Sequence, residues 1–591
     1  MSALTQEIVN TIYKSKQEFI IVGLTGRIGS GCSTAAKFLS QKTKEHNLKE
    51  ICLTDHISDN KRKKYIIHKF YKKNWIQFKS ISLSDIITLF IFQYSYRELE
   101  NIIDKFNSKI EEYKKYKNED PSLKRFKHFN KIKIKSIISK KKYKKYHDKF
   151  YKLLEDIQDS KSKDNYNILY KRIKKFFDAS KKFKKHISDN NYKYYTDLYQ
   201  LCGDNIRLYG DIEIKNTNPN SVYTIADTTN KIIKIIKKHN ELKNKPTYIV
   251  LDALRNIMEM YYFKSRYSAF YMIAINADDK DIKNRLRKKS SNLTTENLEN
   301  QLGKENNKLE LNNIYDFSSQ NIQTCIVNSD MFIYNKDSNI LEMYGQLIKY
   351  ISLIQHPGLV TPSQDEKMMQ IAFTAKLNSA CLSRQVGACV TNKDGSVKAI
   401  GWNSVANGQT PCLLRSSNEL LKSNNLNISY SAYEKSKNFK TKIQNFSNTL
   451  DLHTLNKKGL NDSFCFKTIY TTNNEKEKNN QVHTRSLHAE ENAFLQLAKY
   501  GSGESIIGGT LYSTASPCEL CSKKSYQLGI KRIVYIDPYP GIAREQILNS
   551  GLYPPKIDLF NGVIGDSYYK LYTQMIPFKD ELKCFNNSKE K

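Results

Sequence analysis

The sequence contains no run of eighteen apolar residues, about the length that a helix needs to cross a bilayer. Its first residues, M-S-A-L-T-Q-E, lack the charged and apolar leader of a secreted protein. Cysteine is scarce, with 11 among 591 residues at irregular spacing, which favours reduced thiols over a disulfide framework. We therefore expect a cytoplasmic protein with no membrane partner, long enough for two or three domains.

Acidic residues are also few: the sequence contains 60 Asp and Glu but 95 Lys and Arg, which gives a net charge of +35. The imbalance is local: residues 61–190 hold 37 Lys and Arg but 15 Asp and Glu. One basic block predicts a surface for a polyanion, and the interleaved Tyr and Phe residues suggest stacking on unpaired bases. The alternative is a Lys- and Tyr-biased insertion that forms a solvated helical arm without a ligand.

The most specific pattern lies between Ser486 and Asp537, which reads S-L-H-A-E-E-N-A-F and later A-S-P-C-E-L-C. His488, Cys518 and Cys521 supply one imidazole and two thiolates, a zinc ligand set that leaves the fourth tetrahedral position to water. The spacing matches the H-x-E…P-C-x-x-C pattern of zinc-dependent nucleobase deaminases. The sequence thus predicts a catalytic Zn²⁺ site. The alternative is a structural zinc knuckle, or a redox cysteine pair with an incidental histidine.

Glu490, two residues after His488, is the predicted catalytic carboxylate. Zinc would lower the pKa of its water toward neutrality, and Glu490 would take the water proton, pass it to the ring nitrogen and later protonate the leaving ammonia. Glu491 is the weaker candidate. We expect one helix over 489–500 and another opening at Cys518, so both ligand groups lie at positive helix starts that favour thiolates.

Residues 363 to about 575 resemble the deoxycytidylate deaminase branch of the cytidine deaminase superfamily. The residues that carry the resemblance are D-E-K-M-M-Q-I-A-F-T-A-K-L-N-S-A-C, S-R-Q-V-G-A-C-V, G-W-N and the H-A-E and P-C-E-L-C elements. The resemblance implies that Asn403 holds the sugar, the Ala489 backbone the pyrimidine edge and the Ser516 carbonyl the amino group. It also places Arg384 near the substrate phosphate. Otherwise these positions are a turn asparagine, ordinary backbone and a surface arginine.

A glycine-rich segment near the start of the chain, G-R-I-G-S-G-C-S-T, fits G-x-x-x-x-G-K-[ST] with Cys32 in place of the loop lysine. The backbone would cradle the phosphates of a nucleoside triphosphate, and Ser33 and the strand-ending Asp252 would reach Mg²⁺. Without the lysine, phosphoryl transfer is not favoured, and the alternative is a structural turn that binds nothing. The predicted nucleotide-binding residues are Gly26, Gly29, Ser30, Gly31, Cys32, Ser33, Thr34 and Asp252.

Apolar, β-branched runs alternate with helical patterns in the first half of the chain, which predicts a parallel sheet. The predicted strands cover residues 18–24, 246–254, 271–277 and part of 326–334. The elements Q-L-C-G-D-N-I-R and L-D-A-L-R-N-I-M-E are similar to deoxynucleoside monophosphate kinases. That resemblance implies a P-loop kinase-like α/β domain whose lid contains Arg285 and Arg287.

The stretch H-P-G-L-V-T-P-S-Q, at 356–364, reads as a domain junction. We predict a P-loop kinase-like domain over 1–355 with a helical basic insertion at about 57–195. A cytidine-deaminase-like α/β/α domain over 356–591 follows, with an insertion at about 409–485.

Three further expectations concern the second half of the chain. Cys412, Cys465 and His483 are candidate ligands of a second, structural zinc ion, against ordinary buried thiols and a surface histidine. Tyr539 is expected near the mouth of the substrate site. The tail beyond Phe578 is expected to fray.

Together the two halves resemble the bacterial antiviral cytidine deaminases. The resemblance implies conversion of free dCMP and dCTP to dUMP and dUTP during phage infection, control by the P-loop half, an inhibitory small RNA and a homo-oligomer. The basic insertion would dock such an RNA through phosphate contacts. Three alternatives remain: a housekeeping kinase fused to a dCMP deaminase, a polynucleotide deaminase that flips a cytosine from a single strand, and a non-catalytic binding protein with structural zinc.

Overall fold

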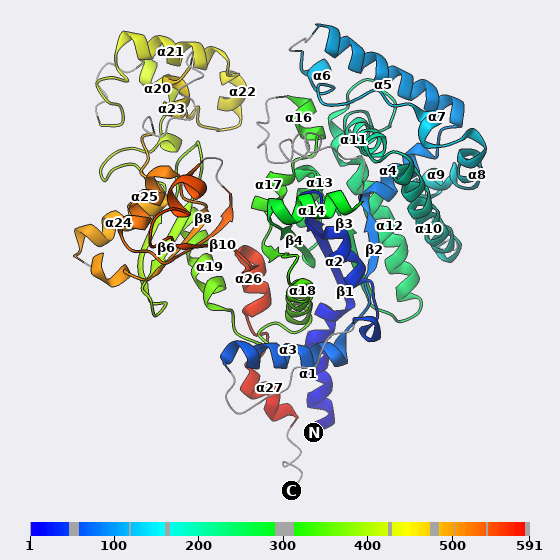
Figure 1. The fold of residues 1–591 in the computed structure, drawn as a ribbon, viewed down its shortest axis with the longest axis horizontal. Coiled ribbons are helices and arrows are strands. Elements are labelled where there is room, and N and C mark those ends of the chain that lie inside the picture. Colours follow the sequence, from blue (N-terminus) through cyan, green and yellow to red (C-terminus); the bar gives the residue numbers. More distant parts are fainter. Residues whose placement is uncertain are drawn as a thin grey trace. The chain divides into compact units, whose positions relative to one another are not determined.

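The computed structural model describes residues 2–46, 58–116, 120–159, 166–289, 313–422, 428–472, 484–501, 503–538 and 542–585. The chain forms two compact units: Met1–Thr361 with Tyr569–Lys591, and Pro362–Tyr568. Each unit has its own sheet (Figure 1). The division falls inside the junction at 356–364, but the last 23 residues, 569–591, group with the first unit, which differs from the predicted boundaries.

Parallel pairing joins the strands of the first unit in the order β5-β4-β1-β3-β2, as a βα alternation requires. The strands are β1 (Phe19–Thr25), β2 (Lys79–Ser82), β3 (Thr247–Asp252), β4 (Phe270–Asn276) and β5 (Met331–Tyr334). The β1, β3 and β4 strands are buried nearly throughout, which explains their continuous apolar runs. The sequence missed β2, because K-S-I-S carries one apolar residue and no alternation.

Helices surround this sheet. α2 ends at Leu39, and a short 3₁₀ turn follows at Thr43–Glu45. The helices of the first unit are α1 (Ser2–Glu18), α2 (Cys32–Leu39), α3 (Asp59–Asn74), α4 (Leu83–Ile91), α5 (Tyr96–Tyr116), α6 (Pro121–Lys124), α7 (Ile134–Ile137), α8 (Lys140–Phe150), α9 (Leu153–Gln158), α10 (Tyr166–Asn190), α11 (Tyr192–Tyr209), α12 (Thr224–Glu241), α13 (Ile257–Arg266), α14 (Asp279–Lys289), α16 (Ile314–Ser318), α17 (Ile322–Val327), α18 (Ile340–Gln355) and α27 (Phe578–Cys584). Among the helices that the structure describes, none has the length and apolar composition required to traverse a bilayer.

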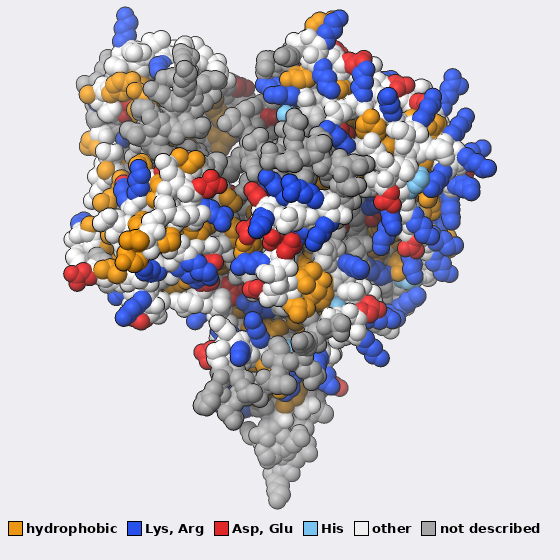
Figure 2. Space-filling model, in the orientation of Figure 1, with side chains coloured by type: hydrophobic (Ala, Val, Ile, Leu, Met, Phe, Trp, Pro, Cys, Tyr) orange, Lys and Arg blue, Asp and Glu red, His pale blue; other side chains and the backbone are white. Residues whose placement is uncertain are grey.

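The basic insertion predicted at about 57–195 forms a packed helical layer. Figure 2 shows Lys and Arg side chains gathered on the outside of the region that Figure 1 labels α8 and α10. Their aromatic residues face inward, since Tyr143, Phe150, Phe176 and Phe183 are each at most 3% exposed. The expectation that such rings stack on nucleic-acid bases is therefore wrong for these four, because each ring gains roughly 2–3 kcal/mol from burial in the core.

The chain forms a helix, α27, over Phe578–Cys584. Glu581 of α27 is 8% exposed, accepts a hydrogen bond from Tyr13 Oη at 3.2 Å and pairs with His356 Nε2 at 3.0 Å. The expected fraying beyond Phe578 is wrong as far as Cys584, because these buried polar contacts hold the helix.

The second unit contains a five-stranded sheet in the order β10-β9-β8-β6-β7. The pairs β7/β6 and β6/β8 are antiparallel, and β8/β9 and β9/β10 are parallel. The strands are β6 (Gly387–Thr391), β7 (Val397–Trp402), β8 (Thr510–Ala515), β9 (Arg532–Asp537) and β10 (Lys556–Leu559); a short β11 (Gly562–Val563) follows. β6 and β7 form a hairpin around Asn392 and Gly395, and the φ of 86° at Gly395 suits glycine.

Two helices cover opposite faces of this sheet. α19 (Gln364–Lys376) begins with a capping box formed by Ser363 and Glu366 and packs on β6 and β8. α24 (Ala489–Lys499) packs on β7 and β6, with Ala493 and Leu497 in the core that it shares with Leu511. α25 (Glu519–Gln527) lies beside α24. α26 (Gly565–Tyr572) contains the boundary after Tyr568, where the second unit ends.

The predicted insertion at about 409–485 has a core of its own. Four short helices, α20 (Ser417–Lys422), α21 (Lys437–Asn448), α22 (Leu452–Lys457) and α23 (Phe466–Tyr470), belong to it. Its buried apolar residues are Leu420, Tyr430, Phe439, Ile443, Phe464 and Ile469. The ion pair between Arg415 and Glu434 is fully buried beside them. The segment therefore folds around both an apolar cluster and a desolvated charge pair.

Candidate active site

Each group of predicted zinc ligands opens a helix. His488 is the N-cap residue of α24, and Cys518 is the N-cap residue of α25, with Cys521 in its first turn. The strand β8 ends three residues before Cys518, and Pro517 precedes the helix. Because α25 follows the central strand β8 so closely, both thiols lie near the carboxyl end of that strand.

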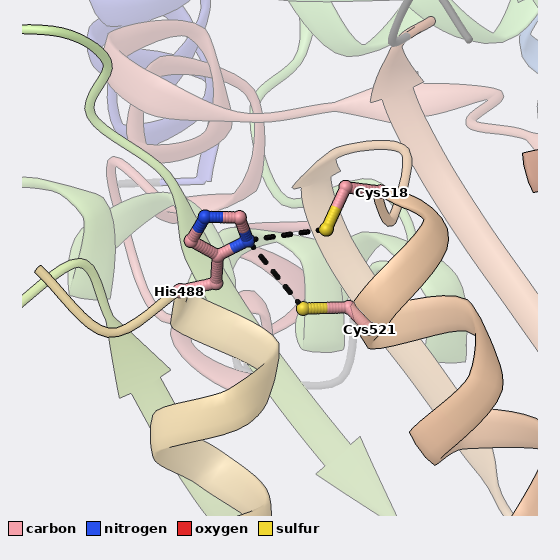
Figure 3. A group of neighbouring side chains, drawn as sticks. All are labelled: His488, Cys518 and Cys521. Carbon is pink, nitrogen blue, oxygen red and sulfur yellow. Dashed lines mark hydrogen bonds between the residues drawn. The ribbon is translucent and has the colours of Figure 1, made fainter. Parts of the chain in front are cut away.

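His488, Cys518 and Cys521 converge on one point, as Figure 3 shows. The Nδ1 atom of His488 lies 3.2 Å from Cys518 Sγ and 3.6 Å from Cys521 Sγ, and all three ligand atoms lie within 4.8 Å of one another. Zinc bonds of ordinary length place tetrahedral nitrogen and sulfur ligands about 3.6 Å apart. The donor set and its spacing therefore fit Zn²⁺, with Nδ1 as the imidazole ligand.

The electrostatics of the cluster favour metal binding. A hydrogen bond from the Cys521 thiol, together with one from His488, lowers the pKa of Cys518. The thiolate is the form of cysteine that binds metal. By contrast, burial raises the pKa of Cys389, a thiol in the middle of β6, to about 12. The second unit therefore contains both a thiol suited to a metal, at the start of α25, and an inert core thiol in β6.

Glu490 is buried next to this cluster, with 4% of its surface exposed. Burial raises the pKa of Glu490, and its own backbone N–H and Ser513 act in the opposite direction. Ser513 Oγ donates a hydrogen bond to Glu490 Oε1 at 2.8 Å. A carboxylate of raised pKa beside a metal site has the properties of a general acid and base.

Glu491 has a different environment. It accepts a hydrogen bond from the backbone N–H of His488 at 3.4 Å and forms an ion pair with Lys524 of α25. Burial acts to raise the pKa of Glu491, but the hydrogen bond and charge of Lys524, together with the backbone N–H and charge of His488, outweigh it, and the net shift is downward. Glu491 therefore links the two ligand-bearing helices and remains ionised, which does not suit a proton shuttle.

Two predicted substrate contacts lie at the end of β7 and at the start of α24. Asn403 follows β7 and is 7% exposed, and its Oδ1 accepts a hydrogen bond from Val386 N at 2.6 Å. Ala489 is fully buried at the first position of α24. A Cβ at Gly401 would lie 2.1 Å from the Ala489 carbonyl oxygen, so only glycine lets β7 approach this helix start.

The other two predicted contacts meet at Asp537, the last residue of β9. Ser516 N donates a hydrogen bond to the Asp537 carbonyl at 2.8 Å. Arg384 forms an ion pair with the Asp537 carboxylate, which is 4% exposed, while the arginine side chain keeps 25% of its surface. The structure thus brings Arg384 to the same strand end as Ser516, with part of its charge balanced.

Sequence reasoning missed Ser513, Asp537 and Lys524 as neighbours of the site. For Ser513 a signal exists, because a serine interrupts the apolar alternation of Leu511 and Ala515 in β8. Asp537 ends a strand of apolar residues, which is a second signal. For Lys524 the sequence offers no signal, since a lysine on the exposed face of a helix is ordinary.

The second zinc site has no support among the described residues, where the group of metal-binding side chains is His488, Cys518 and Cys521. Cys412 Sγ instead accepts a hydrogen bond from Arg415 Nη2 at 3.5 Å. The predicted third ligand, His483, and the predicted mouth residue Tyr539 lie outside the described residues.

In the first unit, residues 26–31 form a tight turn between β1 and α2, and residues 32–34 open α2. Gly26, Gly29 and Gly31 have φ values of 158°, 80° and 119°, and Ser30 is buried. At the start of α2, Ser33 Oγ donates a hydrogen bond to Asp252 Oδ2 at 2.9 Å. The structure therefore brings these two predicted residues together at the carboxyl ends of β1 and β3.

Cys32 and Arg285 complete this turn. The Cys32 side chain is 9% exposed and lies 3.6 Å from Ser30 Oγ, and burial, with the charge of Asp252, raises its pKa to about 12. Arg285 Nη1 donates to the carbonyls of Gly29 and Ser30 at 3.0 and 3.1 Å. The predicted lid arginine thus binds the turn itself, while Arg287 lies farther along α14.

Comparison with known proteins bears on this site. Residues 457–537 match the family described as the cytidine and deoxycytidylate deaminase zinc-binding region. The deoxycytidylate deaminase of Schizosaccharomyces pombe is 28% identical over 208 residues, 35% of this chain and 47% of that protein, so the chain spans about half of its length. The crystal structure of the dCMP deaminase from cyanophage S-TIM5 in complex with dCMP and dUMP is 23% identical, with a TM-score of 0.21 over 34% of this chain and 99% of that one.

The deoxycytidylate deaminase of Enterobacteria phage T2 is 32% identical over 176 residues, which make up 29% of this chain and 79% of the phage protein. Because the match extends over most of the phage protein, the chain belongs to the deoxycytidylate deaminase family.

Proposed function

We propose that this protein is a zinc-dependent hydrolytic deaminase that converts free deoxycytidine nucleotides, dCMP and dCTP, to dUMP and dUTP with release of ammonia. One observation carries the proposal: a single buried carboxylate, Glu490, lies beside the converging ligand atoms of His488, Cys518 and Cys521. Zinc bound there supplies a water of lowered pKa as the nucleophile. Family membership supports a cytosine nucleotide as the substrate.

The residues of the chain account for the proton transfers. Hydrolysis replaces the exocyclic amine of cytosine with oxygen from water. Glu490 takes a proton from the attacking water, gives it to the ring nitrogen and then moves a proton to the departing amine, so that ammonia leaves. Its raised pKa suits a group that must both accept and donate near neutral pH.

The substrate contacts follow from the hydrogen bonds around the site. Asn403 Oδ1 accepts a hydrogen bond from Val386 N. The Nδ2 group of the same amide can still donate, and we assign this donor to a sugar hydroxyl. The Ala489 backbone and the Ser516 carbonyl are assigned to the pyrimidine edge and the amino group. Arg384, held by Asp537, is assigned to the phosphate.

The test is to incubate the purified, zinc-loaded chain with dCMP, dCTP, CMP and a cytosine oligonucleotide and to quantify the uracil products. We expect uracil in the free deoxynucleotides. Uracil in the oligonucleotide alone would instead establish a polynucleotide deaminase. A zinc-replete protein that deaminates none of the four would overturn the proposal and leave a binding protein.

For the first unit we propose a regulatory nucleotide site rather than a kinase. The contact of Ser33 with Asp252 supports Mg²⁺ binding, since a loop hydroxyl and a strand-end aspartate hold this ion in P-loop proteins. The buried, neutral Cys32 provides no cation for transfer chemistry. We expect the chain to bind ATP without releasing phosphate. The variant Ser33→Ala should lose this binding. Phosphate transfer to a nucleoside monophosphate would establish the housekeeping kinase instead.

Three further roles are proposed from the resemblance to antiviral cytidine deaminases. The enzyme depletes dCTP during phage infection, a small RNA inhibits it, and it assembles as a homo-oligomer. The lysine-covered outer face of α8 and α10 supports contact with RNA phosphates, whereas the buried rings oppose base stacking. We expect RNA binding that weakens as the salt concentration rises. It should disappear when Lys141, Lys142 and Lys145 are replaced by glutamine. Phage plating with and without Glu490→Gln tests the defence role.

A further inference from the structure

The strand β8 carries a polar residue in an apolar row. Alternate residues of a strand face opposite sides of the sheet. Leu511 and Ala515 belong to the core that packs on Ala493 of α24, whereas Tyr512 Oη donates to Asp365 of α19 on the other side. Ser513 therefore faces α24, and it is fully buried. A buried hydroxyl at an apolar position loses free energy unless it finds a partner.

The partner of Ser513 is Glu490. The Oγ–Oε1 distance of 2.8 Å is that of a good hydrogen bond, with the hydroxyl donating and the carboxylate accepting. Bonds of this type to an ionised, buried acceptor are stronger than neutral ones. The contact crosses from a strand to a helix whose first turn also follows the zinc ligand His488.

The donor is held rigidly. Ser513 lies in the interior of the sheet, where β8 pairs with Ala388 of β6 on one side and with Tyr535 of β9 on the other. Its Cβ therefore has a position set by the sheet, not by a loop. A side chain placed by regular structure can orient a reacting group more accurately than a loop residue can.

We infer that Ser513 is a positioning residue of the deaminase reaction, whose hydroxyl holds Oε1 of Glu490 so that Oε2 is the oxygen that carries the proton between water and substrate. The inference rests on the proposed function. A carboxylate without this bond rotates about its terminal torsion, which has a broad energy profile. Small displacements of a reacting group reduce turnover strongly while leaving substrate binding intact.

The experiment compares Ser513→Ala and Ser513→Thr with the wild-type, zinc-loaded chain, using dCMP as the substrate. Thr391→Val is the matched control, because it removes another buried hydroxyl of the same sheet, whose Oγ1 bonds to the Thr510 carbonyl and not to Glu490. The measurements are kcat, KM, zinc per chain and the midpoint of thermal unfolding.

We expect Ser513→Ala to lower kcat about 10- to 100-fold with zinc content unchanged, as loss of a supporting hydrogen bond does in other metalloenzymes. KM should stay within about twofold, since Ser513 does not contact substrate. Ser513→Thr, which restores a hydroxyl, should recover most of the rate, and Thr391→Val should keep it.

Two results would overturn the inference. The first is a kcat of Ser513→Ala near that of the wild type. The second is a loss of kcat that follows the loss of zinc or of folded protein and appears equally in Thr391→Val. Failure here differs from failure of the proposed function. An inactive wild-type chain would refute the function, whereas an active wild type with an equally active Ser513→Ala would refute only the positioning role.

Discussion

Arg532 and Asp365 form a two-pronged ion pair: Nη1 donates to Oδ1 at 2.7 Å and Nη2 to Oδ2 at 2.9 Å. The third donor, Nε, reaches Asp558 Oδ2 at 2.7 Å. Arg532 begins β9, Asp365 lies in the first turn of α19 and Asp558 lies in β10. One side chain therefore joins β9 and β10 to α19, which is distant from both in the sequence, and its geometry is the planar fork that only arginine offers.

Replacing Arg532 with methionine, Arg532→Met, should lower the free energy of unfolding of the second unit by about 2 kcal/mol. The magnitude is that of charge-assisted hydrogen bonds at a site about a third exposed. The chain has two tryptophans, and Trp402 lies in the second unit, so urea unfolding in a Trp75→Phe background reports on this unit. Arg544→Met, at an exposed position, is the control, and equal stability of the two variants would contradict the prediction.

The variant Glu490→Gln should retain zinc yet lose turnover of dCMP by about 10²- to 10⁴-fold, because only the proton shuttle is removed. Zinc per chain and dUMP formation are the measurements. Full activity would mean that another carboxylate moves the proton. Glu491 would then be examined next, despite its ion pair with Lys524.

Cys518→Ala should release zinc, because two ligands cannot hold a tetrahedral site that has three protein donors. Zinc per chain after dialysis is measured by elemental analysis. Cys389→Ala is a matched control, since that thiol is buried in β6 and its pKa of about 12 keeps it neutral. Equal zinc in both variants would disprove the assignment of ligands.

The first unit should become less stable in strong alkali. Burial, with the charge of Glu581, raises the pKa of Tyr13 to about 12, from a usual value of 10.0. The folded state therefore favours the neutral phenol. The stability that follows is complete below pH 10 and falls as the pH rises toward 12.

Tyr13→Phe should flatten this decline, since no phenol remains to titrate. The measurement is the urea midpoint of the first unit between pH 8 and 12, followed through Trp75 in a Trp402→Phe background. Tyr116→Phe, at a position 65% exposed, should leave the decline unchanged. A decline of the same size in the Tyr13 variant would assign it to other groups.

The metal cluster could be predicted from the sequence because its chemistry depends on residue types at short spacing. Three ligands and Glu490 lie within two helix starts, and helix starts have readable signals: a proline before Cys518 and an apolar stripe after His488. The strands β1, β3, β4 and β5 of the first sheet could be predicted for a related reason, since buried parallel strands are continuous apolar runs. The strand β2, with a single apolar residue, could not.

What the sequence by itself determined is the kind of site and the order of strands and helices that carries it, because these follow from neighbours along the chain. Only the tertiary structure decided that Ser513 meets Glu490 and that Asp537 holds Arg384. It also decided that Glu581 joins Tyr13 and His356 and that the rings of α8 and α10 lie in the core. These contacts depend on strand register and on which helix face is covered, and both are set when segments remote in sequence bury their apolar surfaces against one another.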